Sequence, residues 1–163
     1  ADDTTKWRAM WRDMYFTRTS ATSGSQAPTP ACPAPMRQFE AVDTTDPNVP
    51  GWMDTYLNNL VATGSTYHDI GMIWGARLAS TKGMFADNVL EGDRTSVSRH
   101  IIFMTDGNME PTNSAYSAYG VEGFEHKVAP ANSSDGLNSV LASYHNNRFL
   151  AACRRAKEEG YTI

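Results

Sequence analysis

The stretch His100-Ile101-Ile102-Phe103-Met104-Thr105-Asp106-Gly107-Asn108 decides how the rest of the chain is interpreted. Four apolar residues follow one another without alternation and end at a Thr-Asp-Gly turn signal. Such a run, bounded by a turn, is typical of a strand buried on both faces in a parallel sheet. A short buried helix has the same apolar pattern, but β-branched and aromatic residues in so short a run favour a strand.

Asp106 follows directly after this predicted strand. In open α/β sheets, ligands bind in the crevice outside the carboxyl ends of the strands. The carboxylate of Asp106 therefore has two interpretations. It caps a turn or the following segment, or it binds a metal ion or a substrate.

The length and composition limit the classes of protein to which this chain can belong. The 163 residues suffice for one domain with a real core but not for two of ordinary size. Fourteen basic and eighteen acidic residues give a net charge of −4 without a basic block, so nucleic acid is not an expected partner. No apolar run has the length of a transmembrane helix or the pattern of a signal peptide.

Amphipathic helices and one further strand are expected along the chain. Apolar residues recur at helical spacing in four segments: 7–14, 53–61, 70–78 and 144–159. The last helix is expected to turn its apolar side chains inward, namely Phe149, Leu150, Cys153 and Ala156. Gly160 is the expected stop of that helix, and Tyr161-Thr162-Ile163 begins another strand.

Two segments rich in Pro, Gly, Ser, Thr and Asn are expected to consist largely of loops, 17–50 and 107–136. A loop as long as the second one, inside a compact domain, commonly carries function. The two cysteines, Cys32 and Cys153, match neither a zinc spacing nor a disulfide framework. They could pair in an oxidising compartment, or Cys153 could be a small core residue of the last helix.

A second segment, Gly64-Ser65-Thr66, is expected at the same edge of the sheet as Asp106, just before a helix. The hydroxyl of Thr66 and the carboxylate of Asp106 are hard oxygen ligands that suit Mg²⁺, Mn²⁺ or Ca²⁺. Thr66 also fits a capping box with Asp69, in which Asp replaces the usual Glu. The two roles are compatible with each other.

A catalytic interpretation remains as the alternative. His68 and Asp69 could act with His100 or His126, although their spacing matches no zinc or nucleophile signature. A metal-dependent hydrolase would use Asp106, Asp69 and His68. This function requires the three groups to converge within hydrogen-bond reach.

Three segments taken together resemble a known family. Thr63–Gly75, Ile101–Gly107 and Asn146–Ile163 are similar, in the same order, to the von Willebrand factor A-like domain of bacterial Tad (tight adherence, Flp) pilus-assembly proteins of the TadG type. Cys32–Arg37 resembles the loop before the first of these segments. The resemblance covers roughly residues 30–163.

The resemblance implies an α/β fold with a doubly wound, mostly parallel sheet. It also implies a metal-ion-dependent adhesion site (MIDAS) for a divalent cation, Mg²⁺, Mn²⁺ or Ca²⁺. Thr66 and Asp106 match two of the three ligand loops, whereas the third, D-x-S-x-S, has no match, and Asp2-Asp3-Thr4-Thr5 does not fit it. We therefore expect residues 1–163 to form a single, partial von Willebrand factor A-like domain, truncated at both ends, with an incomplete cation site.

The function implied by the resemblance is non-enzymatic. The chain would be an interaction or adhesion module of a pilus-assembly or cell-surface protein, in the bacterial cell envelope outside the cytoplasm, either periplasmic or on the cell surface. Its parent protein would be membrane-anchored, and an acidic group of a protein partner would complete the coordination of the metal. Since an incomplete sheet leaves strand edges unpaired, self-association is also expected.

Overall fold

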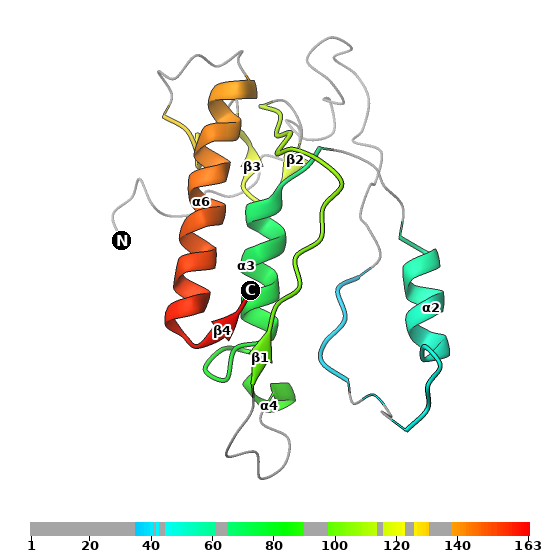
Figure 1. Ribbon diagram of the computed structural model, residues 1–163. Coiled ribbons are helices and arrows are strands. Elements are labelled where there is room, and N and C mark those ends of the chain that lie inside the picture. The colour runs from blue at the N-terminus through cyan, green and yellow to red at the C-terminus, as the bar shows by residue number, and fades with distance from the viewer. Residues whose placement is uncertain are drawn as a thin grey trace. The chain divides into compact units, whose positions relative to one another are not determined.

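A computed structural model describes residues 35–40, 42, 45–60, 65–89, 98–113, 116–122, 126–130 and 138–163. The elements are α2 (Gly51–Asn58), α3 (His68–Leu78), α4 (Ala86–Val89), β1 (Arg99–His100), β2 (Tyr116–Ser117), β3 (Gly120–Val121), α6 (Asn138–Glu158) and β4 (Tyr161–Thr162) (Figure 1). The helix predicted around 7–14 lies outside the described residues, and so does Cys32.

The chain divides into two compact units. One unit comprises Cys32–Glu110 and His145–Ile163, and we call it the α3–α6 unit. The other comprises Ala1–Ala31 and Pro111–Tyr144, and we call it the hairpin unit. The residues singled out by the sequence for metal binding, Thr66 and Asp106, both belong to the α3–α6 unit.

A parallel pair of short strands, β1 and β4, joins two distant parts of the α3–α6 unit. Arg99 pairs with Tyr161, and the N–H of Ile101 extends the ladder by donating to the Thr162 carbonyl at 2.8 Å. Gly160, with φ of 87°, provides the left-handed turn between α6 and β4. The predictions of a helix stop at Gly160 and of a strand after it are confirmed.

The core of the α3–α6 unit contains buried residues from α3, α6 and β4. These are Met72, Ala79, Ala156 and Tyr161, and the half-buried side chains packed against them are Ala76, Ile101, Phe103, Phe149, Ala152 and Cys153. The hydroxyl of Tyr161 donates to the carbonyl of Ala79 at 2.9 Å. Because a buried hydroxyl needs a partner, this bond holds β4 at the C-terminal end of α3.

The run after β1 differs from the strand predicted for it. Ile102 and Met104 are each 85% exposed, whereas Ile101 and Phe103 pack against the core. The side chains thus alternate between two faces with strand periodicity, and only one face is covered. Burial on both faces is therefore wrong for this run, because the core of α3 and α6 packs only against the side on which Phe103 lies.

Helix α6 matches the predicted final helix but has an earlier start, at Asn138 rather than 144. Phe149, Cys153 and Ala156 contribute to the core as expected. Leu150 is 57% exposed, so its predicted inward orientation is wrong. Adjacent residues on a helix are about 100° apart, and with Phe149 facing the core Leu150 is turned toward solvent.

Helix α2 lies at the place predicted for the helix around 53–61, but none of its residues is buried. Leu57 is 54% exposed, and Leu60, beyond the end of the helix, is 46% exposed. Trp52 is half-buried, with the guanidinium of Arg37 at 4.3 Å from its ring centroid. The predicted apolar stripe of this helix therefore faces no core within the described residues.

Besides the first turns of α6, the described part of the hairpin unit contains a small antiparallel ladder and a loop built around one carboxylate. Strands β2 and β3 pair with Ser117 opposite Gly120, whose φ of 90° suits the tight turn. Glu122 is 6% exposed and accepts backbone N–H bonds of 2.6 to 3.2 Å from Lys127, Val128 and Ala129. This segment, expected to be loop, thus contains a buried polar anchor of its own.

Replacing Tyr161 with Phe tests the bond between β4 and α3. The variant leaves the Ala79 carbonyl without its donor, so the free energy of unfolding should fall by about 1–2 kcal/mol. Urea denaturation followed by circular dichroism measures this loss. Tyr56→Phe is the matched control, because the structure gives the Tyr56 hydroxyl no hydrogen bond to another described residue. Equal losses in both variants would contradict the role of the bond.

Candidate functional site

The two segments that carry Thr66 and Asp106 lie against each other. Thr66 and Glu110 form an antiparallel bridge, with N–H···O bonds of 3.1 and 3.2 Å in the two directions. Two residues further on, Nε2 of His68 lies 2.9 Å from Oγ1 of Thr105. The stretch before α3 is therefore fixed at two points along the stretch that contains Asp106, whereas the convergence of Thr66 and Asp106 at one sheet edge stays a prediction.

The turn that presents Asp106 is organised by the hydroxyl of Thr105. This oxygen lies 3.2 Å from the Gly107 carbonyl and 3.3 Å from the Gly107 backbone nitrogen. Such local side-chain bonds are how Thr stabilises turns. Asp106 itself is exposed, so its carboxylate is open to solvent and to a ligand.

His68 is held mainly by aromatic packing. Its ring centroid lies 5.5 Å from that of Phe103 and 5.9 Å from that of Phe149, both in edge-to-face geometry. The two phenylalanine rings are themselves 4.9 Å apart. Its backbone nitrogen lies 3.3 Å from the sulfur of Met109, which is buried. These contacts give His68 a structural role, since they bind the first turn of α3 to the segment before Asp106.

A buried polar cluster, Asp69–His145–Arg148, connects α3 with α6. Asp69 is 0% exposed, and its Oδ2 lies 3.0 Å from Nδ1 of His145, which is 1% exposed. Nε of Arg148 lies 3.5 Å from the same oxygen, which is an ion-pair distance rather than a hydrogen bond. The ring of Tyr67 meets the His145 ring edge-on at 5.1 Å. The carboxylate therefore ties the first turn of α3 to the middle of α6.

Sequence reasoning did not identify His145 and Arg148. They are three residues apart on α6, so they lie on one face of the helix. One sequence signal could have identified them. Both residues can carry a positive charge, and they precede Phe149, Ala152 and Ala156, which pack against the core. Polar residues on a core-facing side require a buried partner, and Asp69 is that partner.

The capping box predicted from Thr66 and Asp69 is wrong. Helix α3 has Tyr67 at its N-cap position and no side-chain capping bond. Thr66 instead pairs through its backbone with Glu110, and Asp69 turns toward α6. Burial explains the difference, because a fully buried carboxylate needs charge-assisted partners, and His145 and Arg148 supply them.

The groups required by the hydrolase alternative have separate environments. Asp69 is closed off from solvent, whereas Asp106 is exposed. Nε2 of His68 meets the hydroxyl of Thr105 rather than either carboxylate. A general acid or base must reach the substrate, so Asp69 is unsuited to that role in this arrangement.

The donors available for a cation are few. Thr66 and Asp106 offer a hydroxyl and a carboxylate, which have the hardness that Mg²⁺, Mn²⁺ and Ca²⁺ require. Within the described ranges, no group of three His, Cys, Asp or Glu side chains could hold a metal ion. Thr66 and Asp106 would supply two oxygens and water or a partner the rest, and a cation shared by these two residues stays a prediction.

The chain was compared with known families, proteins and structures. No protein-family model, curated protein or solved structure matches the chain. In the part of the chain that the structure describes, no helix is both long and apolar enough to cross a bilayer. A proposal of function for this chain therefore rests on the contacts described above and on the resemblance of its sequence.

The thiol of Cys153 is half-buried on α6 and packs against the core. Burial raises the pKa of this thiol above its ordinary value, and the charge of Lys157 opposes part of that rise. Because Cys32 lies outside the described residues, a disulfide between the two cysteines stays a prediction.

The raised pKa of Cys153 predicts slow alkylation. In a Cys32→Ser variant at pH 8, iodoacetamide should modify Cys153 more slowly than free cysteine, because less of the thiol is ionised. The rate should climb as pH rises beyond the ordinary thiol pKa of about 8.5. Mass spectrometry follows the reaction, and unfolding in urea should restore the rate of free cysteine. Equal rates in the folded and unfolded protein would contradict the burial.

Removing His145 tests the Asp69–His145–Arg148 cluster. His145→Ala leaves the buried carboxylate of Asp69 with the more distant Arg148, so the free energy of unfolding should fall by about 3 kcal/mol or more. His100→Ala is the control, because His100 is exposed and its ring hydrogen-bonds to Ser98 at the surface. Its effect should stay within about 0.5 kcal/mol. Urea denaturation measures the free energy of unfolding of both variants. Similar losses in the two would contradict the role of His145 as the buried partner of Asp69.

Proposed function

We propose that this chain is a non-enzymatic interaction module of the von Willebrand factor A type, which binds a protein partner through a divalent cation held near Thr66 and Asp106. The observation that carries the proposal is the pairing of the two segments. The Thr66–Glu110 bridge and the His68–Thr105 contact bring together a hydroxyl-bearing segment and a carboxylate-bearing turn. These are the two ligand loops that the resemblance assigns.

The surface chemistry of this region suits binding better than catalysis. Asp106 is exposed on a turn, while the neighbouring His68 is engaged in packing and Asp69 is buried. A cation bound at Asp106 would retain open coordination positions, because protein oxygens are scarce there. An acidic group of a partner would fill one of those positions, and the charge of the metal would make the interaction sensitive to chelators.

The charge of the chain gives the cation a second role. The net charge of −4 repels an acidic partner at long range. A divalent ion between the two carboxylates removes that repulsion locally and replaces it with two favourable contacts. Metal-dependent association is therefore the expected behaviour of an acidic module with an acidic partner.

The proposed setting is the bacterial cell envelope, with a pilus-assembly or surface-adhesion component as the partner, and it rests on the resemblance. The parallel β1–β4 pair, with α6 in the crossover between its strands, supports an α/β architecture of this kind. The doubly wound sheet and the MIDAS-type site belong to the same proposal.

Isothermal titration calorimetry tests the cation site. Mg²⁺, Mn²⁺ and Ca²⁺ should bind the chain weakly, with Kd on the order of 1 mM for a partial oxygen site. Asp106→Ala should abolish this binding. Asp87→Ala is the matched control, since Asp87 is an exposed carboxylate in the first turn of α4. Identical titrations of Asp106→Ala and the parent chain would remove Asp106 from the site.

A further inference from the structure

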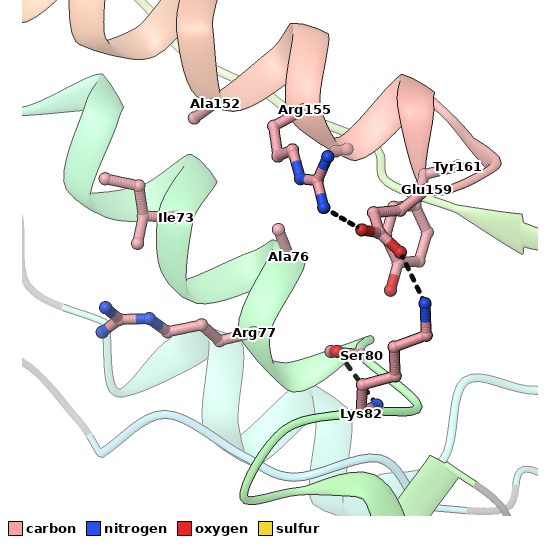
Figure 2. A pocket seen from close by; sticks show the side chains of 10 residues that line it. Ile73, Ala76, Arg77, Ser80, Lys82, Ala152, Arg155, Glu159 and Tyr161 are labelled. Atoms are coloured by element: carbon pink, nitrogen blue, oxygen red, sulfur yellow. Dashed lines mark hydrogen bonds and ion pairs between the residues drawn. The ribbon is translucent and has the colours of Figure 1, made fainter.

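A pocket of about 280 Å³ lies between the C-terminal halves of α3 and α6, away from the turn that carries Asp106 (Figure 2). Its apolar lining includes Ile73 and Ala76 from α3 and Ala152 and Ala156 from α6. Alanine side chains are too short to fill the space between two helices, so a recess remains. Tyr161 lines one end of the pocket, where its hydroxyl bond to Ala79 fixes the ring.

The polar lining of this pocket is predominantly cationic. Arg77, Lys82 and Arg155 line it together with one carboxylate, that of Glu159. Figure 2 shows Arg155 and Lys82 converging on Glu159 from two sides. The Lys82 contact is long, at 3.5 Å, and its side chain is 79% exposed, so this cation is only loosely engaged. Arg155 also pairs with Glu158, at 3.3 Å, so Lys82 is the more weakly held of these two cations.

Arg77 adds a cation without a carboxylate partner among the described residues. Its guanidinium lies 4.9 Å from the ring centroid of Trp74, which orients the side chain by cation–π contact. Figure 2 shows the Arg77 side chain directed away from Glu159. An excess of positive charge around an apolar recess stands out in a chain whose net charge is −4.

We propose that this pocket binds an acidic peptide segment of a protein partner, which inserts one bulky apolar side chain between α3 and α6. Its carboxylates would accept hydrogen bonds from Arg77 and from the loosely held Lys82. The volume is at the small end of ligand sites and accommodates one aromatic side chain rather than a cofactor. This second surface goes beyond the proposed cation site and needs no metal.

The geometry explains why a peptide is the fitting occupant. Bidentate arginine recognition favours carboxylates, and the open recess between two helices accepts a side chain projected from an extended backbone. The anchor would bury apolar area against the alanines, while the charged rim would set the specificity. Binding should therefore weaken with added salt but persist with a chelator present.

Fluorescence anisotropy with a labelled peptide tests the proposal on the full chain. The probe carries one phenylalanine flanked by aspartates and glutamates, and its Kd should be on the order of 100 μM. Arg77→Gln should weaken binding roughly tenfold, because one charge-assisted contact is lost. Arg154→Gln is the matched control, since Arg154 is exposed on α6 but does not line the pocket. It should change Kd by less than about twofold.

Two further arms separate the pocket from general electrostatics. Ala152→Leu fills the recess without changing charge and should abolish binding, as should replacing the phenylalanine of the peptide with alanine. The altered peptide is measured with the unmodified chain, so this measurement tests the proposal even if the Ala152→Leu variant does not fold. Equal weakening by Arg77→Gln and Arg154→Gln would overturn the proposal. A concentration-dependent dimer that Arg77→Gln dissociates, without peptide binding, would also overturn it by assigning the pocket to a second copy.

Discussion

The buried carboxylate of Asp69 is the constraint on which the α3–α6 unit depends. An isolated ionised group with 0% exposure would be strongly unfavourable, so the fold must bring His145 and Arg148 to it. That requirement sets the register of α3 against α6, and the apolar contacts of Met72 and Ala156 follow from it. Breaking the pair would therefore disturb more than one contact, because the same register positions the residues on either side of Asp69.

The residues next to Asp69 connect the buried cluster to the surface turn that contains Asp106. His68 packs against the neighbouring rings of Phe103 and Phe149 and meets Thr105, while Thr66 pairs with Glu110. The turn with Asp106 is thus attached to the core through short, specific contacts. At the C-terminal end of α3, the hydroxyl of Tyr161 donates to the carbonyl of Ala79. The small side chains of Ala76, Ala152 and Ala156 line a pocket there, together with cationic side chains. The two proposed binding surfaces therefore share one support, the packed helices α3 and α6.

Much of the local structure could be predicted, because it depends on short-range signals. Gly160 ends a helix and Tyr161 begins a strand, as their positions indicate. Contact between the Thr66 and Asp106 segments was expected from a strand that ends at Thr105, but β1 ends at His100 and the bridge joins Thr66 to Glu110. Burial could not be predicted in the same way, since it depends on which elements meet. Ile102 and Met104 read as core but are exposed, and the partners of Asp69 lie on a helix far away in sequence.

The proposed function requires a divalent cation to bind where the Thr66 and Asp106 segments meet. Paramagnetic broadening by Mn²⁺, followed in amide NMR spectra of the full chain, tests it most directly, because broadening falls steeply with distance from the ion. If the cation binds there, the amides of Thr66, Asp106 and Gly107 broaden at the lowest Mn²⁺ concentration and recover when a chelator is added. Broadening centred on another carboxylate, such as Asp54 or Asp87, or spread evenly over all exposed acids, would contradict it.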